Sequence, residues 1–234
     1  MMSLATYDER RGRLETYFDA TAVDAWAQLT SDAPVSRIRA TVRQGRDRMR
    51  DLILSWLPAD MTYAELLDAG CGTGALSVAA AGRGARVVAV DVAGNLVNLA
   101  RERAPADLGG GLIDFRVGDM LDPALGAFTH VAAMDSLIHY PTRDIVGVLA
   151  GLARRTAGSI VFTFAPRTPA LSVMWAMGRL FPRADRAPAI EPVTEAALRK
   201  AIGAHPELEE WQVGRTARII SGFYTSQAME LVRR

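Results

Sequence analysis

The stretch LDAGCGTG, residues 67–74, decides the fold of this chain. It follows a short apolar run at residues 64–68 and precedes a run of helical composition at residues 75–81. Gly70 permits a tight turn, while Gly72 and Gly74 allow backbone to approach a ligand where any side chain would clash. A glycine turn between a strand and a helix therefore predicts a ligand site at the carboxyl end of a parallel sheet.

Strand and helix patterns alternate along the chain from residue 58 onward. Residues 86–92 include Val-Val-Ala-Val, which is typical of a buried parallel strand. Further strands are expected at residues 113–117, 128–134 and 159–164, and helices at residues 95–103, 144–155 and 194–202, the last capped by Thr194. Such alternation predicts a parallel sheet with right-handed crossovers and helices on both faces.

The end of the chain departs from the parallel pattern. Strand candidates at residues 209–213 and 219–224 lie close together, and a parallel crossover needs roughly a dozen residues or more. We therefore expect an antiparallel hairpin here. The expected fold class is α/β, a Rossmann-like doubly wound sheet that is mostly parallel and ends in this hairpin.

Two regions flank or interrupt the sheet pattern. Residues 1–57 show helical periodicity and are expected to form an N-terminal arm or lid over a domain at residues 58–234. Residues 166–192 are irregular and apolar, and are expected on the substrate side as pocket wall or as core. Six arginines lie between the apolar positions of the second helix; they favour a solvated helix face, with an anion-facing surface as the alternative. They are Arg37, Arg39, Arg43, Arg46, Arg48 and Arg50.

Composition limits the classes of partner and compartment. The 234 residues carry a net charge of +1, so no overall field attracts nucleic acid or an anionic membrane. The single cysteine, Cys71, rules out a disulfide framework and fits a reducing cytoplasm. No signal peptide is recognised, and no apolar run reaches the roughly 20 residues of a transmembrane helix. Residues 169–181 are too short for one and contain Arg179, so at most peripheral membrane association is expected.

Acidic residues end the next two strands. Asp91, with Val92 after it, lies about 20 residues beyond the glycine turn, where a carboxylate can accept hydrogen bonds from both hydroxyls of a ribose. Asp119 ends the third strand, where it can accept from an adenine amino group while Met120 packs against the ring. With Asp68 before the turn, this set resembles the class I S-adenosylmethionine (SAM)-dependent methyltransferases. A two-half NAD dehydrogenase would need a second βαβαβ set, which is not found.

The resemblance implies SAM as cofactor and no resident metal ion. The residues expected to bind SAM are Asp68, Gly70, Cys71, Gly72, Gly74, Asp91, Val92, Asp119, Met120 and Asp135. The fourth strand runs into residues 134–141, which should face the methyl group, and His139 is the best-placed titratable residue there. Cys71 is not expected to act as a nucleophile, because no histidine lies nearby in sequence to act as its base.

From about residue 14 onward the chain resembles one enzyme family, the magnesium protoporphyrin IX O-methyltransferases. The matching stretches are YFDAT at 17–21 with Trp26, VRQGR at 42–46, DAGCGTG at 68–74, DSLIHY at 135–140, FAPRT at 164–168, LFP at 180–182 and GFYTS at 222–226. The resemblance implies methylation of a porphyrin propionate, roles for Tyr17 and His139 near that carboxylate, and contact with the large subunit of magnesium chelatase. It also implies possible attachment to photosynthetic membranes.

The chemistry of a propionate agrees with this expectation. Its carboxylic pKa lies near 4.3, so it is ionised at neutral pH and needs positioning more than a strong base. His139 or Tyr17 would then orient the carboxylate, and His139 as an axial magnesium ligand is a lesser alternative. Two other functions stay open from the residues alone. One is methylation of another small apolar acceptor such as a quinone, and the other is SAM binding without catalysis.

Overall fold

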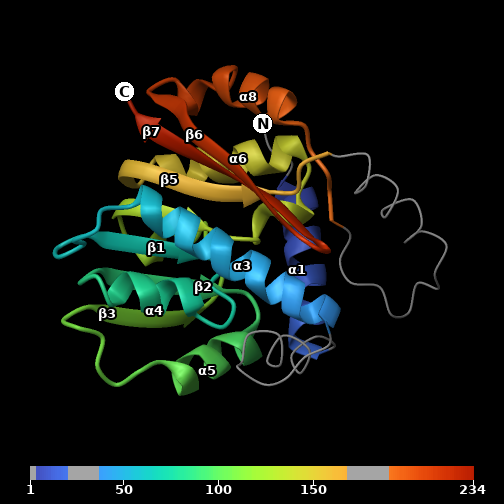
Figure 1. The fold of residues 1–234 in the computed structure, drawn as a ribbon. Coiled ribbons are helices and arrows are strands. Elements are labelled where there is room, and N and C mark those ends of the chain that lie inside the picture. The colour runs from blue at the N-terminus through green and yellow to red at the C-terminus, as the bar shows by residue number, and fades with distance from the viewer. Residues whose placement is uncertain (1–3, 21–36, 168–189) are drawn as a thin grey trace.

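The structure is a computed structural model that describes residues 4–20, 37–167 and 190–234 (Figure 1). The expectations for Trp26, and for nearly all of the apolar insertion at residues 166–192, lie outside the described residues.

A seven-stranded sheet forms the centre of the described chain, in the order β3-β2-β1-β4-β5-β7-β6. The strands are β1 Glu65–Ala69, β2 Arg86–Asp91, β3 Leu112–Val117, β4 Phe128–Ala133, β5 Thr156–Phe164, β6 Trp211–Ser221 and β7 Tyr224–Arg233. The first five strands pair in parallel, and β7 lies antiparallel between β5 and β6. The expected doubly wound sheet with a terminal hairpin is confirmed.

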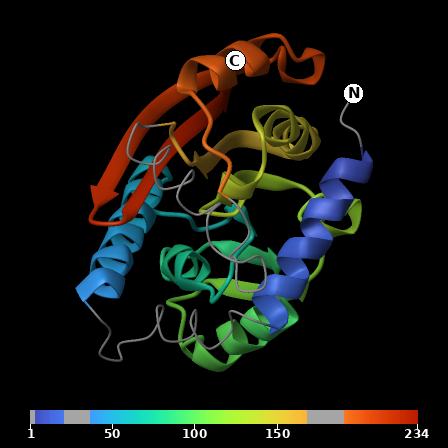
Figure 2. The same cartoon turned by 90° about the vertical axis from the view of Figure 1, so that its right-hand side faces the viewer.

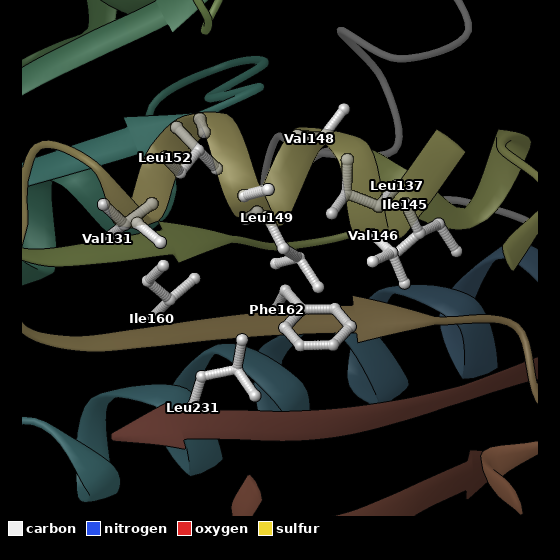
Figure 3. Packing of buried hydrophobic residues seen from close by; sticks show 14 of the residues in the cluster. Val131, Leu137, Ile145, Val146, Val148, Leu149, Leu152, Ile160, Phe162 and Leu231 are labelled. Atoms are coloured by element: carbon white, nitrogen blue, oxygen red, sulfur yellow. The ribbon is translucent and has the colours of Figure 1, made fainter. Parts of the chain in front are cut away.

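Successive residues of the central strands belong to two different hydrophobic clusters, because side chains along a strand point alternately to the two faces of the sheet. Val131 and Ile160 belong to the cluster under α6 (Thr142–Ala153) and α8 (Glu195–Gly203), shown in Figure 3. Their neighbours Ala132 and Val161 face the other cluster. That second cluster is covered by α3 (Arg37–Trp56), α4 (Ala75–Ala81) and α5 (Gly94–Arg103).

The hairpin is longer than the sequence pattern indicates, and its turn lies elsewhere. The expected strand at 219–224 is the end of β6, the turn at Gly222 and the first residue of β7. Gly222 has a φ of 56°, in the left-handed region that such a turn requires. The expectation was wrong because β7 is a buried inner strand that nevertheless carries Gln227 and Glu230, so it does not look apolar.

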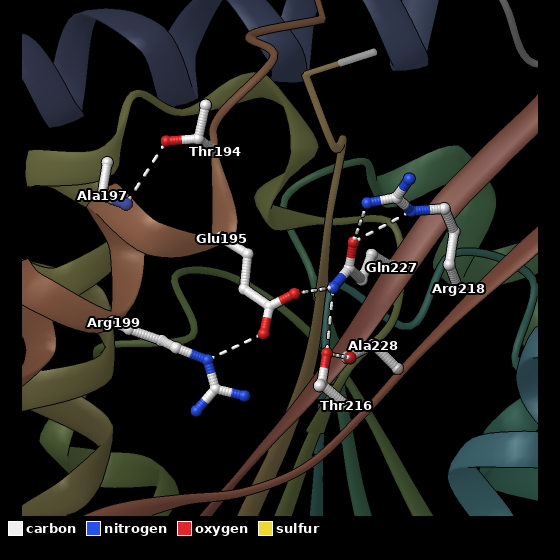
Figure 4. Close-up of polar contacts among 8 residues, drawn as sticks. All are labelled: Thr194, Glu195, Ala197, Arg199, Thr216, Arg218, Gln227 and Ala228. Atoms are coloured by element: carbon white, nitrogen blue, oxygen red, sulfur yellow. Dashed lines mark hydrogen bonds and ion pairs between the residues drawn. The ribbon is translucent and has the colours of Figure 1, made fainter.

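Polar partners from neighbouring elements satisfy the buried side chain of Gln227 (Figure 4), and Arg215 of β6 donates to the carboxylate of Glu230 at 2.8 Å. The amide of Gln227 donates to Glu195 at 2.6 Å and to Thr216 at 3.0 Å, and its oxygen accepts from Arg218 at 2.7 Å. At the start of α8, the hydroxyl of Thr194 accepts from the backbone N–H of Ala197 at 3.3 Å, which confirms the expected cap.

The two N-terminal helices lie on different parts of the sheet. Helix α1 (Leu4–Ala20) runs across the carboxyl ends of the strands, whereas α3 packs along the sheet and the β6–β7 hairpin (Figures 1 and 2). Gly45 makes that packing possible, since a Cβ there would lie 2.4 Å from the ring of Tyr224. The domain boundary expected after residue 57 falls just beyond the end of α3.

None of the helices in the described ranges has both the length and the hydropathy that a membrane crossing requires.

Candidate active site

A cavity of about 280 Å³ opens at the carboxyl ends of β1, β2 and β4, between α1 and α3. Figure 2 looks onto these strand ends, with α1 and α3 on opposite sides. Its floor is formed by the glycine turn and Asp91, and one wall by the loop after β4, which includes the short 3₁₀ helix Leu137–His139. The expected site residues that line it are Asp68, Gly70, Cys71, Gly72, Asp91, Val92, Met120, Asp135 and His139.

The three glycines of the turn serve different purposes. Gly70 has a φ of 82°, and a Cβ there would lie 2.3 Å from the Cβ of Ser136, so the turn packs directly against the β4 loop. Gly72 has a φ of 53° and borders the cavity, with no atom within 4 Å of a Cβ built there. Gly74 does not line the cavity; a Cβ on it would approach Phe115 at 3.0 Å. Gly74 therefore supports helix–strand packing, and Gly72 leaves room at the cavity, where its expected contact with a ligand stays a prediction.

Asp91 is held in place by backbone N–H groups. One carboxylate oxygen accepts from Gly72 at 2.9 Å and the other from Ala93 at 2.9 Å. Burial raises the pKa of Asp91 despite these bonds. The carboxylate is thus fixed at the tip of β2 beside the glycine turn, where an acceptor for ribose hydroxyls is expected.

Asp68 is buried just before the turn, and Cys71 is half-buried within it. Asp68 is buried and accepts a 2.5 Å hydrogen bond from Ser77. Burial, opposed in part by that bond, raises the pKa of Asp68 to about 6. Burial also raises the pKa of the Cys71 thiol well above its usual value, with the nearby carboxylates adding to the effect. A thiol that stays protonated is a poor nucleophile, in agreement with the sequence interpretation.

The carboxylate of Asp119 is bonded to residues of helix α1, and Asp119 does not itself line the cavity. It accepts from the hydroxyl of Tyr7 at 2.7 Å and from the guanidinium of Arg11 at 2.5 Å, and the N–H of Leu121 donates to the same carboxylate at 2.8 Å. Burial, followed by the proximity of Tyr140 and Asp119, raises the pKa of Tyr7, so its phenol stays a donor. Asp119 therefore anchors α1 over the cavity, and the role expected for it toward adenine stays a prediction.

Asp135 is the meeting point of several elements. It accepts from Arg46 of α3 at 2.8 Å and from Tyr224 and Ser226 of β7 at 3.1 Å each. Its own N–H donates to Thr163 of β5 at 2.7 Å. Its φ of 56° is strained for a residue with a side chain. The carboxylate thus holds the β4 loop, and cofactor binding by Asp135 stays a prediction.

The two expected catalytic residues are placed differently. His139 lines the cavity, its backbone oxygen accepts from Arg10 at 3.0 Å, and its ring lies 6.1 Å from that of Phe18. Tyr17 is half-buried and is not among the residues lining the cavity; its ring packs edge-on against Phe18 at 5.2 Å. Tyr17 is therefore connected to His139 through Phe18.

Two residues at the site, Tyr7 and Arg11, are absent from the sequence expectations, and three arginines of α3 were expected mainly on a solvated face. Tyr7 and Arg11 were missed because nothing local indicates that they meet a carboxylate more than a hundred residues away. Arg43, Arg46 and Arg50 line the cavity from α3, so the arginine-rich face is only partly solvated. Their spacing of three and four residues places them on one face, and this was the available signal.

The cavity suits an adenosyl ligand with a polar amino-acid tail. Gly72 and Asp91 border it at the position expected for a ribose, and that contact stays a prediction. Met120 offers an apolar surface, and the buried hydroxyl of Ser136 has no partner in the described structure. A sheet of this order with such a site at its carboxyl edge defines the class I SAM-dependent methyltransferases.

Comparisons with known proteins narrow the class. A family model described as methyltransferase domain matches residues 66–157, and one described as magnesium-protoporphyrin IX methyltransferase C-terminus matches residues 133–233. The chain is 48% identical over 225 residues to the magnesium-protoporphyrin O-methyltransferase of Rhodobacter capsulatus, covering 96% of this chain and 97% of the relative. A Synechocystis relative of the same name is 32% identical over 220 residues, 93% of this chain and 94% of that one. This chain therefore belongs to the magnesium-protoporphyrin O-methyltransferase family.

A solved structure agrees with this assignment. The crystal structure of magnesium protoporphyrin IX methyltransferase from Synechocystis with bound SAH superposes with a TM-score of 0.83 at 30% identity, covering 95% of this chain and 99% of that chain.

Proposed function

We propose that this protein transfers the methyl group of SAM to a propionate carboxylate of magnesium protoporphyrin IX, giving the monomethyl ester on the route to chlorophyll or bacteriochlorophyll. The observation that carries this proposal is similarity over nearly the whole chain, at 48% identity, to a relative with this activity in its name. The cavity at the strand ends, lined by the glycine turn and Asp91, supports the use of SAM.

The residues around the cavity suit a reaction that is governed by the positioning of the two reactants. A bound SAM supplies an electrophilic methyl group on a sulfonium. Asp91 and the backbone of Gly72 would hold its ribose, fixed to each other at 2.9 Å before any ligand arrives. Since a propionate is already ionised at neutral pH, the protein has to bring its oxygen in line at about 3 Å from the methyl carbon.

His139 would orient the acceptor carboxylate at the β4 side of the cavity. The bond from Arg10 to its backbone oxygen and the packing of Phe18 against its ring restrict its position. Tyr17 would act on the far side of Phe18, toward the part of the substrate outside the cavity. Helix α1, which carries both Tyr17 and Phe18, would also exclude water from the reacting groups.

Delivery of the substrate is a further part of this proposal. A hydrophobic porphyrin with two carboxylates is poorly suited to free diffusion, so we propose transfer from the large subunit of magnesium chelatase. We also propose that the protein associates peripherally with photosynthetic membranes.

A quinol acceptor is the main competing function. Relatives named ubiquinone biosynthesis O-methyltransferase are 34% identical, but the match covers only 53% of this chain, compared with 92% or more for the three porphyrin relatives. The difference in coverage favours the porphyrin as substrate, because a match over nearly the whole chain also includes the elements outside the shared methyltransferase core.

The decisive experiment is a methyl-transfer assay with SAM and either magnesium protoporphyrin IX or the metal-free porphyrin, with products separated by chromatography. We expect the monomethyl ester from the magnesium porphyrin. Absence of ester in a sample that demonstrably binds SAM would reject the proposed activity and favour a binding function.

A further inference from the structure

Ser136, in the β4 wall of the cavity, carries a buried hydroxyl that lacks a hydrogen-bond partner in the described structure. The Oγ of Ser136 is shielded from solvent and bonds to nothing in the described structure, although its residue lines the cavity. A buried polar group without a partner costs folding free energy, and each such group in a native protein needs a reason. A ligand in the cavity would supply the missing partner.

The position of this hydroxyl is set by its neighbours. The preceding residue, Asp135, adopts a φ of 56° and is held by Arg46, Tyr224 and Ser226. Strained backbone of this kind persists only where the surroundings enforce it, and it concentrates at functional sites. On its other side Ser136 packs against Gly70 of the cofactor turn. The hydroxyl is therefore fixed in place beside the proposed SAM site.

The adjacent wall, from α3, is basic. Arg43, Arg46 and Arg50 line the cavity, whereas Asp47 is the one acidic residue that α3 contributes to it. The 2.8 Å bond from Arg46 to Asp135 brings this wall to the residue next to Ser136. Guanidinium groups beside a fixed hydroxyl are the donors that recognise a carboxylate.

We propose that Ser136, Arg43 and Arg46 form a subsite for a ligand carboxylate, with the hydroxyl and the guanidinium N–H groups as donors. This inference rests on the proposed function, which supplies two carboxylate sources. One is the amino-acid carboxylate of SAM, and the other is a propionate of the porphyrin. In either case the subsite fixes one end of a ligand whose reacting centre lies deeper in the cavity.

Ser136→Ala separates a ligand contact from a structural role. Loss of an unpartnered buried hydroxyl should leave the melting temperature unchanged or raise it, while affinity for the carboxylate ligand falls about tenfold or more, as for a lost bond to a charged group. Arg43→Gln should act in the same direction. Arg48→Gln is the matched control, since Arg48 lies on α3, is exposed and does not line the cavity.

Paired probes identify the source of the carboxylate. Calorimetry would compare S-adenosylhomocysteine with its decarboxylated analogue. Fluorescence quenching would compare magnesium protoporphyrin with its dimethyl ester. A selective loss of S-adenosylhomocysteine binding assigns the subsite to the cofactor, and a selective loss of diacid porphyrin binding assigns it to the substrate.

Two results would overturn the subsite: unchanged affinity for every probe in both variants, or equal losses for probes with and without the carboxylate. These binding measurements do not depend on turnover. A protein that forms no porphyrin ester but binds S-adenosylhomocysteine through its carboxylate would refute the proposed function and retain the subsite.

Discussion

The phenol of Tyr7 donates a 2.7 Å hydrogen bond to Asp119, which joins the first helix to the tip of β3. Arg11, one turn further along α1, reaches the other oxygen of the same carboxylate. The ring of Tyr7 also stacks on Tyr140 at 5.6 Å, in the loop that carries His139. Helix α1 is thus attached to two strand tips on either side of the cavity, and its position governs access to it.

Tyr7→Phe should loosen this attachment without disturbing the core, because the ring stays and only the hydroxyl is lost. A bond to a charged acceptor contributes about 1.5–3 kcal/mol, so hydrogen exchange of α1 amides should become about tenfold faster or more. Exchange in β1 should not change. Glu9→Gln is the control, since Glu9 is exposed on the same helix. Unaltered exchange in α1 would show that the bond does not hold the helix.

Asp91→Asn should weaken cofactor binding by about tenfold or more, because the fixed carboxylate loses its charge and one acceptor for the ribose hydroxyls. Calorimetric titration with S-adenosylhomocysteine measures this. Asp114→Asn, on the exposed face of β3 where Asp114 pairs with Arg116, serves as control. Equal affinities in Asp91→Asn and the control would show that Asp91 does not bind the cofactor.

Asp68 should make stability depend on pH between about 4 and 6. Its folded pKa of about 6 exceeds the usual 3.8, so in this interval the folded state binds more protons than the unfolded chain. The contribution of this group to the free energy of unfolding therefore falls as pH rises through the interval. Asp68→Asn removes the cost of burying this charge. At pH 7 the free energy of unfolding of the variant should therefore exceed that of the unchanged protein by about 3 kcal/mol at most.

Urea unfolding of both proteins at pH 7 and pH 4 tests this prediction. The gain in unfolding free energy from Asp68→Asn should shrink toward zero at pH 4, because Asp68 is protonated in the folded state at that pH. A difference that is the same at both pH values would mean that the substitution acts through packing or hydrogen bonding and not through ionisation.

Gly45→Ala should destabilise the protein although alanine is the better helix former by about 1 kcal/mol. Its Cβ would lie 2.4 Å from the ring of Tyr224 and force α3 away from the hairpin, at a cost of about 1–3 kcal/mol. Gly12→Ala is the matched helical control, because nothing lies within 4 Å of a Cβ there. Denaturant midpoints of the two variants should move in opposite directions, and a shared direction would contradict the close packing.

His139→Ala should lower turnover with magnesium protoporphyrin by less than about 100-fold, because an ionised propionate needs no general base. A quinol hydroxyl would need a general base, and general bases contribute about 10²–10⁴-fold. If the acceptor were a quinol, the variant would therefore lose nearly all of its activity. Initial rates at saturating substrate measure the effect. Complete loss of ester formation, in a variant that still binds the porphyrin, would contradict the prediction that His139 only assists in orienting an ionised carboxylate.

The sequence by itself determined the strand–turn–helix at residues 67–81, the acidic end of β2 and the alternation that makes a doubly wound sheet. These features are local, since glycine at positive φ and strand periodicity are properties of a few consecutive residues. The tertiary structure alone decided that Tyr7 and Arg11 meet Asp119, that Arg46 and Tyr224 share Asp135, and that β7 hides Gln227 and Glu230 inside the sheet. Such pairings depend on how distant segments pack. The periodicity of the sequence does not indicate which buried polar side chains will contact each other.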